Sequence, residues 1–319
     1  MTEPSIQDVL DGIEQPSRYL GNETNAVHKD HSRVDLHAVL AFPDLYDIGT
    51  SHFGMQILYH ILNQRPDTVA ERAFAPGVDM EARLRTLGRP LTSLESGTPL
   101  RNFDIIGFSL LYELNYTNIL TMLELSNIAF LSAHRQEDDP LVIAGGPCTC
   151  NPEPVADFFD AMLIGDGEAA IVAMAEKWLA WKKNGRKSRQ ALLRQWSELD
   201  GVYIPSFFKP IYDVKGLQHL EPKYTNYSRI KRTVVEDLDG AAFPIQPVVP
   251  FGRPIHDRLR LEVARGCTRG CRFCQAGMIY RPVRERSVKT LMNQTDRALW
   301  RTGYEDLSLL SLSTGDYSC

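Results

Sequence analysis

The chain has 319 residues, of which 43% are hydrophobic and 24% are charged. This composition is ordinary for a globular protein and excludes a disordered, collagen-like or disulfide-dense chain. The 35 basic and 40 acidic residues give a formal net charge of −5. No overall positive field therefore draws the chain to nucleic acid or to anionic lipid.

The sequence contains no run of eighteen apolar residues, which argues against a membrane-spanning helix and a membrane partner. The acidic N-terminus lacks the pattern of an export signal, so we expect a cytoplasmic protein. At about 150 residues per domain, the length allows two domains. Six cysteines in a reducing compartment are expected to bind a metal or a cluster rather than to form disulfides.

Short apolar runs alternate with helical patterns along the first half of the chain. Strands are predicted at 36–42, 69–74, 103–110, 141–144 and 161–164, and helices at 52–62, 79–87, 115–125 and 169–181. This alternation predicts an α/β domain with a mostly parallel, doubly wound sheet. Ligands bind at the carboxyl ends of such strands, where the turns Gly145-Gly146 and Gly165-Asp166-Gly167-Glu168 lie. We therefore expect a nucleotide- or cofactor-binding domain.

The composition changes along the chain in a way that predicts four segments. They are an N-terminal extension at 1–34, the α/β domain at 35–183, a linker at 184–250 and a last domain at 251–319. Within the linker, 202–212 and 217–224 are predicted to pair as a β-hairpin, and prolines 244, 247 and 250 favour extended backbone.

Three cysteines lie within eight residues, on a glycine-containing loop directly after a predicted strand at 259–264. Cys267, Cys271 and Cys274 are separated by three and by two residues. Three thiolates can hold three corners of a cubane cluster and leave one iron open for a small molecule. Zinc is the alternative, but four ligands would then have to include distant residues such as His256 or Cys319. The spacing favours the cluster.

The motif Cys267-x-x-x-Cys271-x-Phe273-Cys274 resembles the signature of radical S-adenosylmethionine (SAM) enzymes. The resemblance implies a [4Fe–4S] cluster held by the three cysteines, with Phe273 beside SAM. It also implies that the strand at 259–264, a helix at 287–301 and a strand at 306–312 begin a partial (β/α) barrel.

In the same family a motif after the second barrel strand contacts the amino group of SAM. Ser313, Gly315 and Asp316 occupy that place here, with Asp316 where a glutamate is usual. The resemblance therefore implies that these three residues bind SAM.

The upstream domain resembles the flavodoxin-like, cobalamin-binding domain that precedes many radical SAM domains. Ser109 matches its Ser-x-Leu element, and Gly145-Gly146 matches its double glycine. The element Asp-x-His-x-x-Gly is out of register, because Asp47, His52 and Gly54 have the right types at the wrong spacing. This implies either cobalamin without a histidine ligand or a domain that has kept the fold and lost the cofactor.

Blocks along nearly the whole chain resemble an uncharacterised bacterial group of radical SAM proteins with a B12-binding domain. Examples are Phe42–Gly49, Asn151–Pro154 and Ser311–Cys319. The chain stops after the second of six expected barrel strands, so we expect a truncated radical SAM domain.

The function that the resemblance implies is reductive cleavage of SAM to a 5′-deoxyadenosyl radical that acts on an unknown substrate. An electron donor such as flavodoxin or ferredoxin would be the partner, and cobalamin a further cofactor. The alternatives are a non-catalytic cofactor-binding module and a methylthiotransferase-like RNA-modifying enzyme. Nothing in the sequence selects nucleic acid over a small molecule as the substrate.

Several further residues carry weaker signals. Cys148 and Cys150 fit a tight turn better than a redox pair. The acidic turn 165–168 suits a phosphate site and a plain helix start equally. Arg265 is expected to neutralise the cluster, whereas Arg269 is expected to be solvated.

Overall fold

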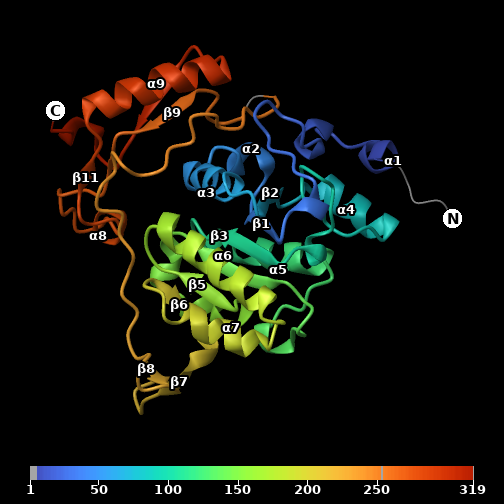
Figure 1. Ribbon diagram of the computed structural model, residues 1–319, viewed down its shortest axis with the longest axis vertical. Coiled ribbons are helices and arrows are strands. Elements are labelled where there is room, and N and C mark those ends of the chain that lie inside the picture. Colours follow the sequence, from blue (N-terminus) through green and yellow to red (C-terminus); the bar gives the residue numbers. More distant parts are fainter. Residues whose placement is uncertain (1–5, 253, 319) are drawn as a thin grey trace.

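A six-stranded sheet forms the centre of the first domain in the computed structural model, which describes residues 6–252 and 254–318 (Figure 1). Its strands are β1 (Leu36–Phe42), β2 (Thr68–Phe74), β3 (Ile105–Ser109), β4 (Leu141–Gly145), β5 (Ala161–Leu163) and β6 (Val202–Tyr203). The order is β2-β1-β3-β4-β5-β6, with β1 to β5 parallel and β6 antiparallel to β5. The first five strands follow the order of flavodoxin-like sheets. The predicted α/β class with a parallel sheet is confirmed.

Helices cover both faces of this sheet. They are α2 (Tyr46–Gly49), α3 (Phe53–Asn63), α4 (Val78–Leu87), α5 (Tyr116–Leu125), α6 (Glu168–Lys183) and α7 (Arg189–Trp196), preceded by α1 (Ile6–Leu10). The helices α3 and α6 contact each other, and α7 contacts α6. On the other face α4 and α5 are joined by hydrogen bonds from Arg85 to Glu124.

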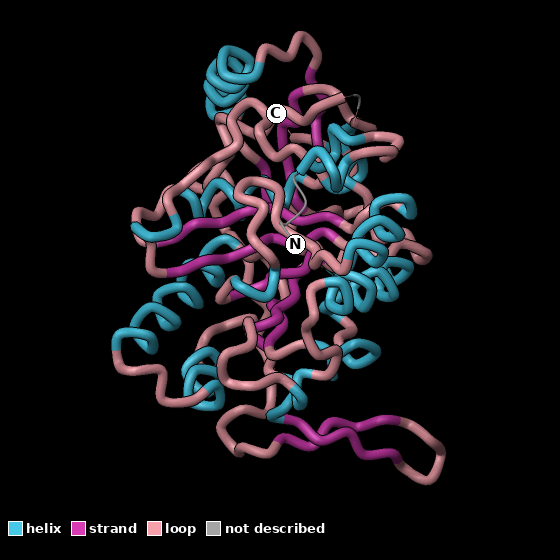
Figure 2. The backbone as a smooth tube through the Cα atoms, turned by 90° about the vertical axis from the view of Figure 1, so that its right-hand side faces the viewer, coloured by secondary structure: helices cyan, strands magenta, loops and turns pink. Residues whose placement is uncertain are grey.

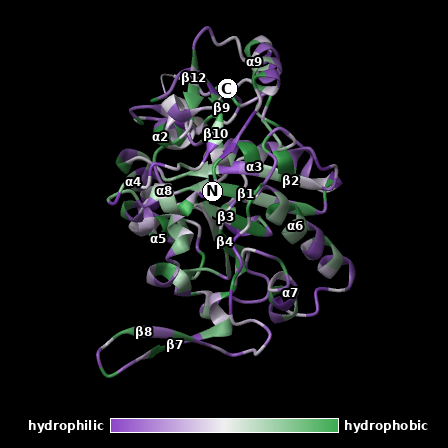
Figure 3. Ribbon diagram, turned by 90° about the vertical axis from the view of Figure 1, so that its left-hand side faces the viewer, coloured by the Kyte–Doolittle hydropathy of each residue, from purple (hydrophilic) through white to green (hydrophobic). Residues whose placement is uncertain are grey.

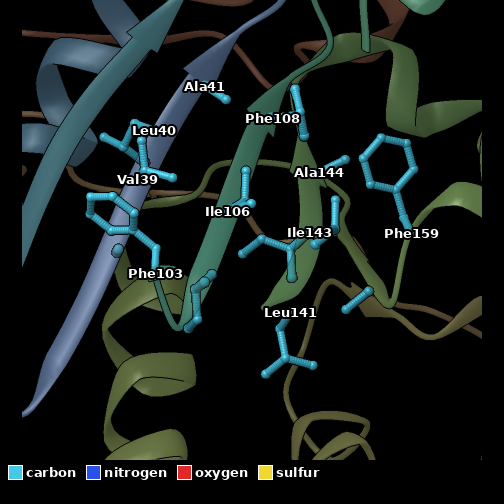
Figure 4. Close-up of a cluster of buried hydrophobic side chains, with 14 of the residues drawn as sticks. Val39, Leu40, Ala41, Phe103, Ile106, Phe108, Leu141, Ile143, Ala144 and Phe159 are labelled. Carbon is cyan, nitrogen blue, oxygen red and sulfur yellow. The ribbon is translucent and has the colours of Figure 1, made fainter. Parts of the chain in front are cut away.

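The core lies on both sides of the central strands (Figure 4). All seven residues of β2 are buried, and Val39, Ile106 and Val142 of the neighbouring strands are fully inaccessible. Apart from Thr68, Glu71 and Arg72 of β2, the strands covered on both faces are largely apolar runs, which is why their positions could be predicted to within two residues. Figure 3 shows hydrophobic residues on β1 and β3 inside the molecule and hydrophilic residues on the outside of α7.

Short 3-10 turns connect these elements. They are Pro16–Tyr19, His31–Arg33, Leu100–Asn102, Glu113–Asn115, Ser132–His134, Pro147–Cys150, Glu153–Phe158, Pro205–Phe207 and Thr314–Asp316.

The predicted β-hairpin exists but begins later than expected. It consists of β7 (Phe208–Tyr212) and β8 (Gln218–Pro222) and projects from the body of the molecule (Figure 2). Val202–Tyr203 belongs instead to the main sheet as β6. The expectation of one strand over 202–212 is wrong because Pro205, which has no N–H to donate, starts a 3-10 turn there.

The segment expected as a linker contributes to the first domain's core. Leu192 and Trp196 of α7 are fully buried, and Phe207 and Val248 pack in the same cluster. Part of the polar segment at 184–250 therefore folds onto the sheet.

A smaller C-terminal unit follows the linker. It contains β9 (Leu259–Glu262), β10 (Ala264–Arg265), α8 (Ala276–Ile279), β11 (Arg284–Glu285), α9 (Val288–Thr302) and β12 (Leu307–Leu310). The strands β9 and β12 pair in parallel and are connected through α9, so the predicted strand–helix–strand order is confirmed. A second core joins these elements and includes Leu261, Val263 and Leu291. In the described part of the chain, no helix has the length and apolarity needed to cross a membrane.

Candidate active site: an interdomain cleft and a cysteine loop

A cleft of about 470 Å³ lies between the carboxyl edge of the first domain's sheet and the C-terminal unit. Ser109, Gly145 and Gly146, which were predicted as cofactor contacts, all line this cleft at the ends of β3 and β4. Glu262 and Gly266 line it from the opposite side. The volume lies in the range of cofactor and small-molecule sites, about 300–1,000 Å³. The structure therefore brings together the residues that the sequence placed at the strand ends.

Two glycines let the backbone form the wall of the cleft. Gly146 has φ +107°, and a Cβ there would lie 2.6 Å from the carbonyl oxygen of Leu110. Gly165 has φ +111°, and its Cβ would lie 2.2 Å from the carbonyl oxygen of Thr233. Side chains other than hydrogen are therefore excluded at both positions.

Ion pairs across the cleft hold the two domains together. Asp166 pairs with Arg284 at 2.5 Å, and Glu168 pairs with Arg265 at 2.6 Å. Glu262 also accepts from Arg265, at 2.8 Å. Burial opposes the charge of Arg265, but the two glutamates outweigh it and raise its pKa. The acidic turn at 165–168 thus faces arginines. We call its two ion pairs, Asp166–Arg284 and Glu168–Arg265, the interdomain clasp. Because these carboxylates are already paired at the start of α6, the turn does not favour a phosphate.

The predicted metal ligands lie on the loop between β10 and α8. Cys267 and Cys274 are half-buried, Cys271 is exposed, and all three are free thiols. The backbone N–H of Arg269 donates to Sγ of Cys267, and that of Gly277 donates to Sγ of Cys274, both at 3.4 Å. These hydrogen bonds orient two sulfur atoms, each of which keeps lone pairs that can bind a metal ion.

The donor set of this loop fits an iron–sulfur cluster. Within residues 6–252 and 254–318, no three His, Cys, Asp or Glu side chains converge on one point as the ligands of a single ion do. Ligands of a cubane bind different irons, so their sulfurs do not need to share one centre. Three soft thiolates also suit iron–sulfur chemistry better than a hard cation. Cys319, the distant zinc candidate, lies outside the described residues.

The predicted SAM-binding residues lie beside the same loop. Phe273 is 92% exposed, and Ser313, Gly315 and Asp316 belong to the turn after β12. Asp316 accepts from Nε of Arg269 at 2.6 Å and from the Ser313 hydroxyl at 2.7 Å. These hydrogen bonds lower the pKa of Asp316.

Arg269, which was expected to be simply solvated, is exposed but paired with Asp316. It therefore connects the cysteine loop to the turn after β12. The two residues are 47 positions apart, so the sequence carries no local signal of their contact.

His52 lies at the first domain's side of the cleft and caps α3. Its Nδ1 accepts the N–H of Met55 at 3.2 Å, which places the proton of the neutral ring on Nε2. Burial and the charge of Arg260 lower the pKa of His52 to about 4. In this state neither ring nitrogen offers a lone pair to a metal.

Cys148 and Cys150 occupy a 3-10 turn that contacts α8. Burial raises the pKa of both thiols, which keeps them protonated at neutral pH. Cys150 lines the cleft, so it also serves as a thiol control for the loop cysteines.

Sequence reasoning missed two residues of the site. Arg232, in the polar linker, donates to the carbonyl oxygens of Ile279 and Arg281 and so supports the segment after the cysteine loop. Tyr280 lines the cleft. Neither residue stands in a motif, so no sequence signal marks them.

Comparison with known proteins gives one family match. Residues 54–205 match the model of the N-terminal region of radical SAM proteins. This segment contains most of the first domain and ends before the cysteine loop.

Among curated sequences, the chain is 27% identical over 238 residues to the "Uncharacterized protein MJ0966" of Methanocaldococcus jannaschii. The alignment covers 74% of this chain and 44% of that protein, so the chain spans less than half the length of this relative.

Two solved structures of TsrM from Kitasatospora setae, a radical S-adenosylmethionine methyltransferase, are similar to this chain. One contains cobalamin and a [4Fe–4S] cluster, with 12% identity and a TM-score of 0.49. The other contains tryptophan and the SAM analogue aza-SAM, with 11% identity and a TM-score of 0.48. Each comparison covers 88% of this chain and 48% of TsrM.

Proposed function

We propose that this chain is a radical SAM enzyme that holds a [4Fe–4S] cluster through Cys267, Cys271 and Cys274. The observation that carries the proposal is the set of three free thiols on one loop beside a 470 Å³ cleft. Three protein ligands leave one iron of a cubane for a small molecule. When bound, such a cluster would take one electron from an external donor and pass it to SAM, and the C5′–S bond of SAM would then break to give methionine and a 5′-deoxyadenosyl radical.

The chain's own residues position these groups. Gly266 has φ +86°, and a Cβ there would lie 2.6 Å from the carbonyl oxygen of Pro282, so glycine lets the loop fold tightly at its start. Asp316 and Arg269 hold the turn after β12 against the loop. We place the amino group of SAM near Ser313, Gly315 and Asp316, where hydroxyl and carboxylate oxygens are available to accept its N–H groups.

We further propose that the cleft binds cobalamin. The glycine turns expose backbone along the carboxyl edge of the sheet, which is where cofactors bind in this class of fold. Because Nδ1 of His52 accepts a hydrogen bond and Nε2 carries the proton, we do not expect this histidine to hold the cobalamin. A cobalamin in the cleft would make methyl transfer the favoured reaction, with a substrate of unknown class.

Anaerobic reconstitution with iron and sulfide tests the proposal. We expect about four irons and four sulfides per wild-type chain, and loss of the cluster in Cys267→Ser, Cys271→Ser or Cys274→Ser. Cys150→Ser is the matched control and should keep the cluster, because its thiol lies in the cleft wall.

Incubation of the reconstituted protein with dithionite and SAM, followed by mass spectrometry of 5′-deoxyadenosine, tests the reaction. Formation of 5′-deoxyadenosine that depends on the three cysteines supports the enzyme. Stoichiometric zinc with no iron after reconstitution overturns the cluster. An intact cluster that neither binds nor cleaves SAM supports the alternative of a non-catalytic cofactor-binding module.

A further inference from the structure

A buried arginine lies where β9 meets the first domain. Arg260 is only 7% exposed, and its Nη2 donates to the carbonyl oxygen of Thr50 at 3.2 Å. Thr50 belongs to the turn between α2 and α3, so Arg260 connects the C-terminal unit to that turn.

Arg260 differs from the other buried arginines of the described chain. Arg72, Arg135, Arg189, Arg284 and Arg286 each form an ion pair with at least one carboxylate. Among the described residues, Arg260 has no carboxylate within ion-pair distance, and its Nη1 has no hydrogen-bond partner. Burial lowers the pKa of Arg260 to about 10, which still leaves the guanidinium charged at neutral pH. A buried charge without a counter-charge is strongly unfavourable, so its environment favours an anion.

The space next to Arg260 limits the size of that anion. A cavity of about 10 Å³ is lined by Arg260 together with Phe53, Gln56 and Tyr304. A cavity this small favours a small anion over a bulky one. The hydroxyl of Thr50, whose carbonyl accepts from Arg260, is also buried without a partner.

We propose that Arg260 binds a small monovalent anion, of the size of a halide ion or of one carboxylate oxygen, at the contact between the two domains. The anion supplies the charge that every other buried arginine receives from a glutamate or an aspartate. It lies outside the cleft and does not depend on the proposed cluster chemistry. Its expected effect is to stabilise the docking of β9 on the turn before α3.

Thermal unfolding in different salts tests this proposal in solution. At constant ionic strength, we expect the wild-type Tm to be at least about 2 °C higher in sodium chloride than in sodium methanesulfonate, whose anion is bulky and carries no carboxylate. Arg260→Met should abolish the difference whatever its own Tm is. Arg297→Met, which removes an exposed arginine from α9, should preserve the difference.

Crystals of the full chain soaked in sodium bromide provide the second measurement. An anomalous peak beside Nη1 of Arg260 in the wild type, absent from Arg260→Met, supports the site. A stabilisation by sodium acetate that also depends on Arg260 supports the same site and identifies a carboxylate as its source. Equal Tm values in all three salts with no bromide peak, or a chloride effect that persists in Arg260→Met, overturns the proposal.

Discussion

The first domain and the C-terminal unit both contain parallel strands connected through a helix, but the side chains of these strands are buried to very different extents. All residues of β2 in the first domain are buried, whereas Leu307 and Leu309 of β12 are 43% and 47% exposed. The first domain is therefore held by its own core. The C-terminal unit has a small core and takes its position from ion pairs with Asp166 and Glu168. Ion pairs therefore contribute to the shape of the cleft alongside the apolar contacts of this small core.

The largest expected effect comes from a buried charge cluster inside the first domain. Arg72 pairs with Glu23 at 2.9 Å and with Glu95 at 2.6 Å, and both carboxylates are inaccessible. Arg72→Met leaves two buried carboxylates without a counter-charge, which should lower the free energy of unfolding by about 3–5 kcal/mol. Urea unfolding followed by the fluorescence of the buried Trp178 and Trp196 measures this change.

Arg85 provides the matched control for this prediction. It also pairs with two glutamates, Glu81 and Glu124, but on the exposed surface. Arg85→Met should change stability little because solvent screens exposed pairs. Equal losses in the two variants would show that burial does not set the strength of these pairs.

The second prediction concerns the pH dependence of stability that arises from His52, which lies where the first domain meets the C-terminal unit. Burial and Arg260 hold the pKa of His52 at about 4, against about 6.5 in an unfolded chain. The unfolded state therefore binds a proton first as the pH falls, so this contribution to stability is complete above pH 6.5 and is lost between pH 6.5 and 4. The loss should reach up to about 3 kcal/mol.

His52→Asn is the control, since asparagine also caps helices but does not titrate. The wild type should lose more stability than this variant over that pH range in urea titrations at several pH values. Parallel curves would contradict a half-buried His52 that stays neutral down to about pH 4. The same variant should leave cobalamin binding unchanged, because His52 has no free lone pair for cobalt.

The smallest effect is local and tests the clasp directly. Glu168→Gln removes the carboxylate that pairs with Arg265 while keeping its shape. We expect amide exchange in residues 264–285 to be about tenfold faster, which corresponds to ~1.4 kcal/mol of local opening, with β1 to β5 unchanged. Glu176→Gln on the same helix, where the carboxylate is 61% exposed, is the control. If the exchange rates of residues 264–285 stay at their wild-type values in both variants, the pair of Glu168 with Arg265 does not hold the C-terminal unit in place.

The sequence predicted features that depend on local patterns. The buried strands of the first domain were found from their apolar runs, and the cysteine loop was found from its spacing. The start of the hairpin was misplaced because the residues before Pro205 pair with β5 of the main sheet, and the sequence alone does not show which strand lies beside them. The clasp joins residues about one hundred positions apart, and the partner of Arg269 lies 47 positions away. Such contacts are set by the packing of domains and leave no local signal.

Electron paramagnetic resonance of the reduced, reconstituted protein, with and without SAM, tests the central claim most directly. We predict a cluster signal that changes when SAM is added, because Cys267, Cys271 and Cys274 leave one iron free to bind it. The signal should persist in Cys150→Ser and vanish in each loop variant. A cluster signal that SAM leaves unchanged, or stoichiometric zinc without any iron signal, would contradict a SAM-binding cluster on this loop.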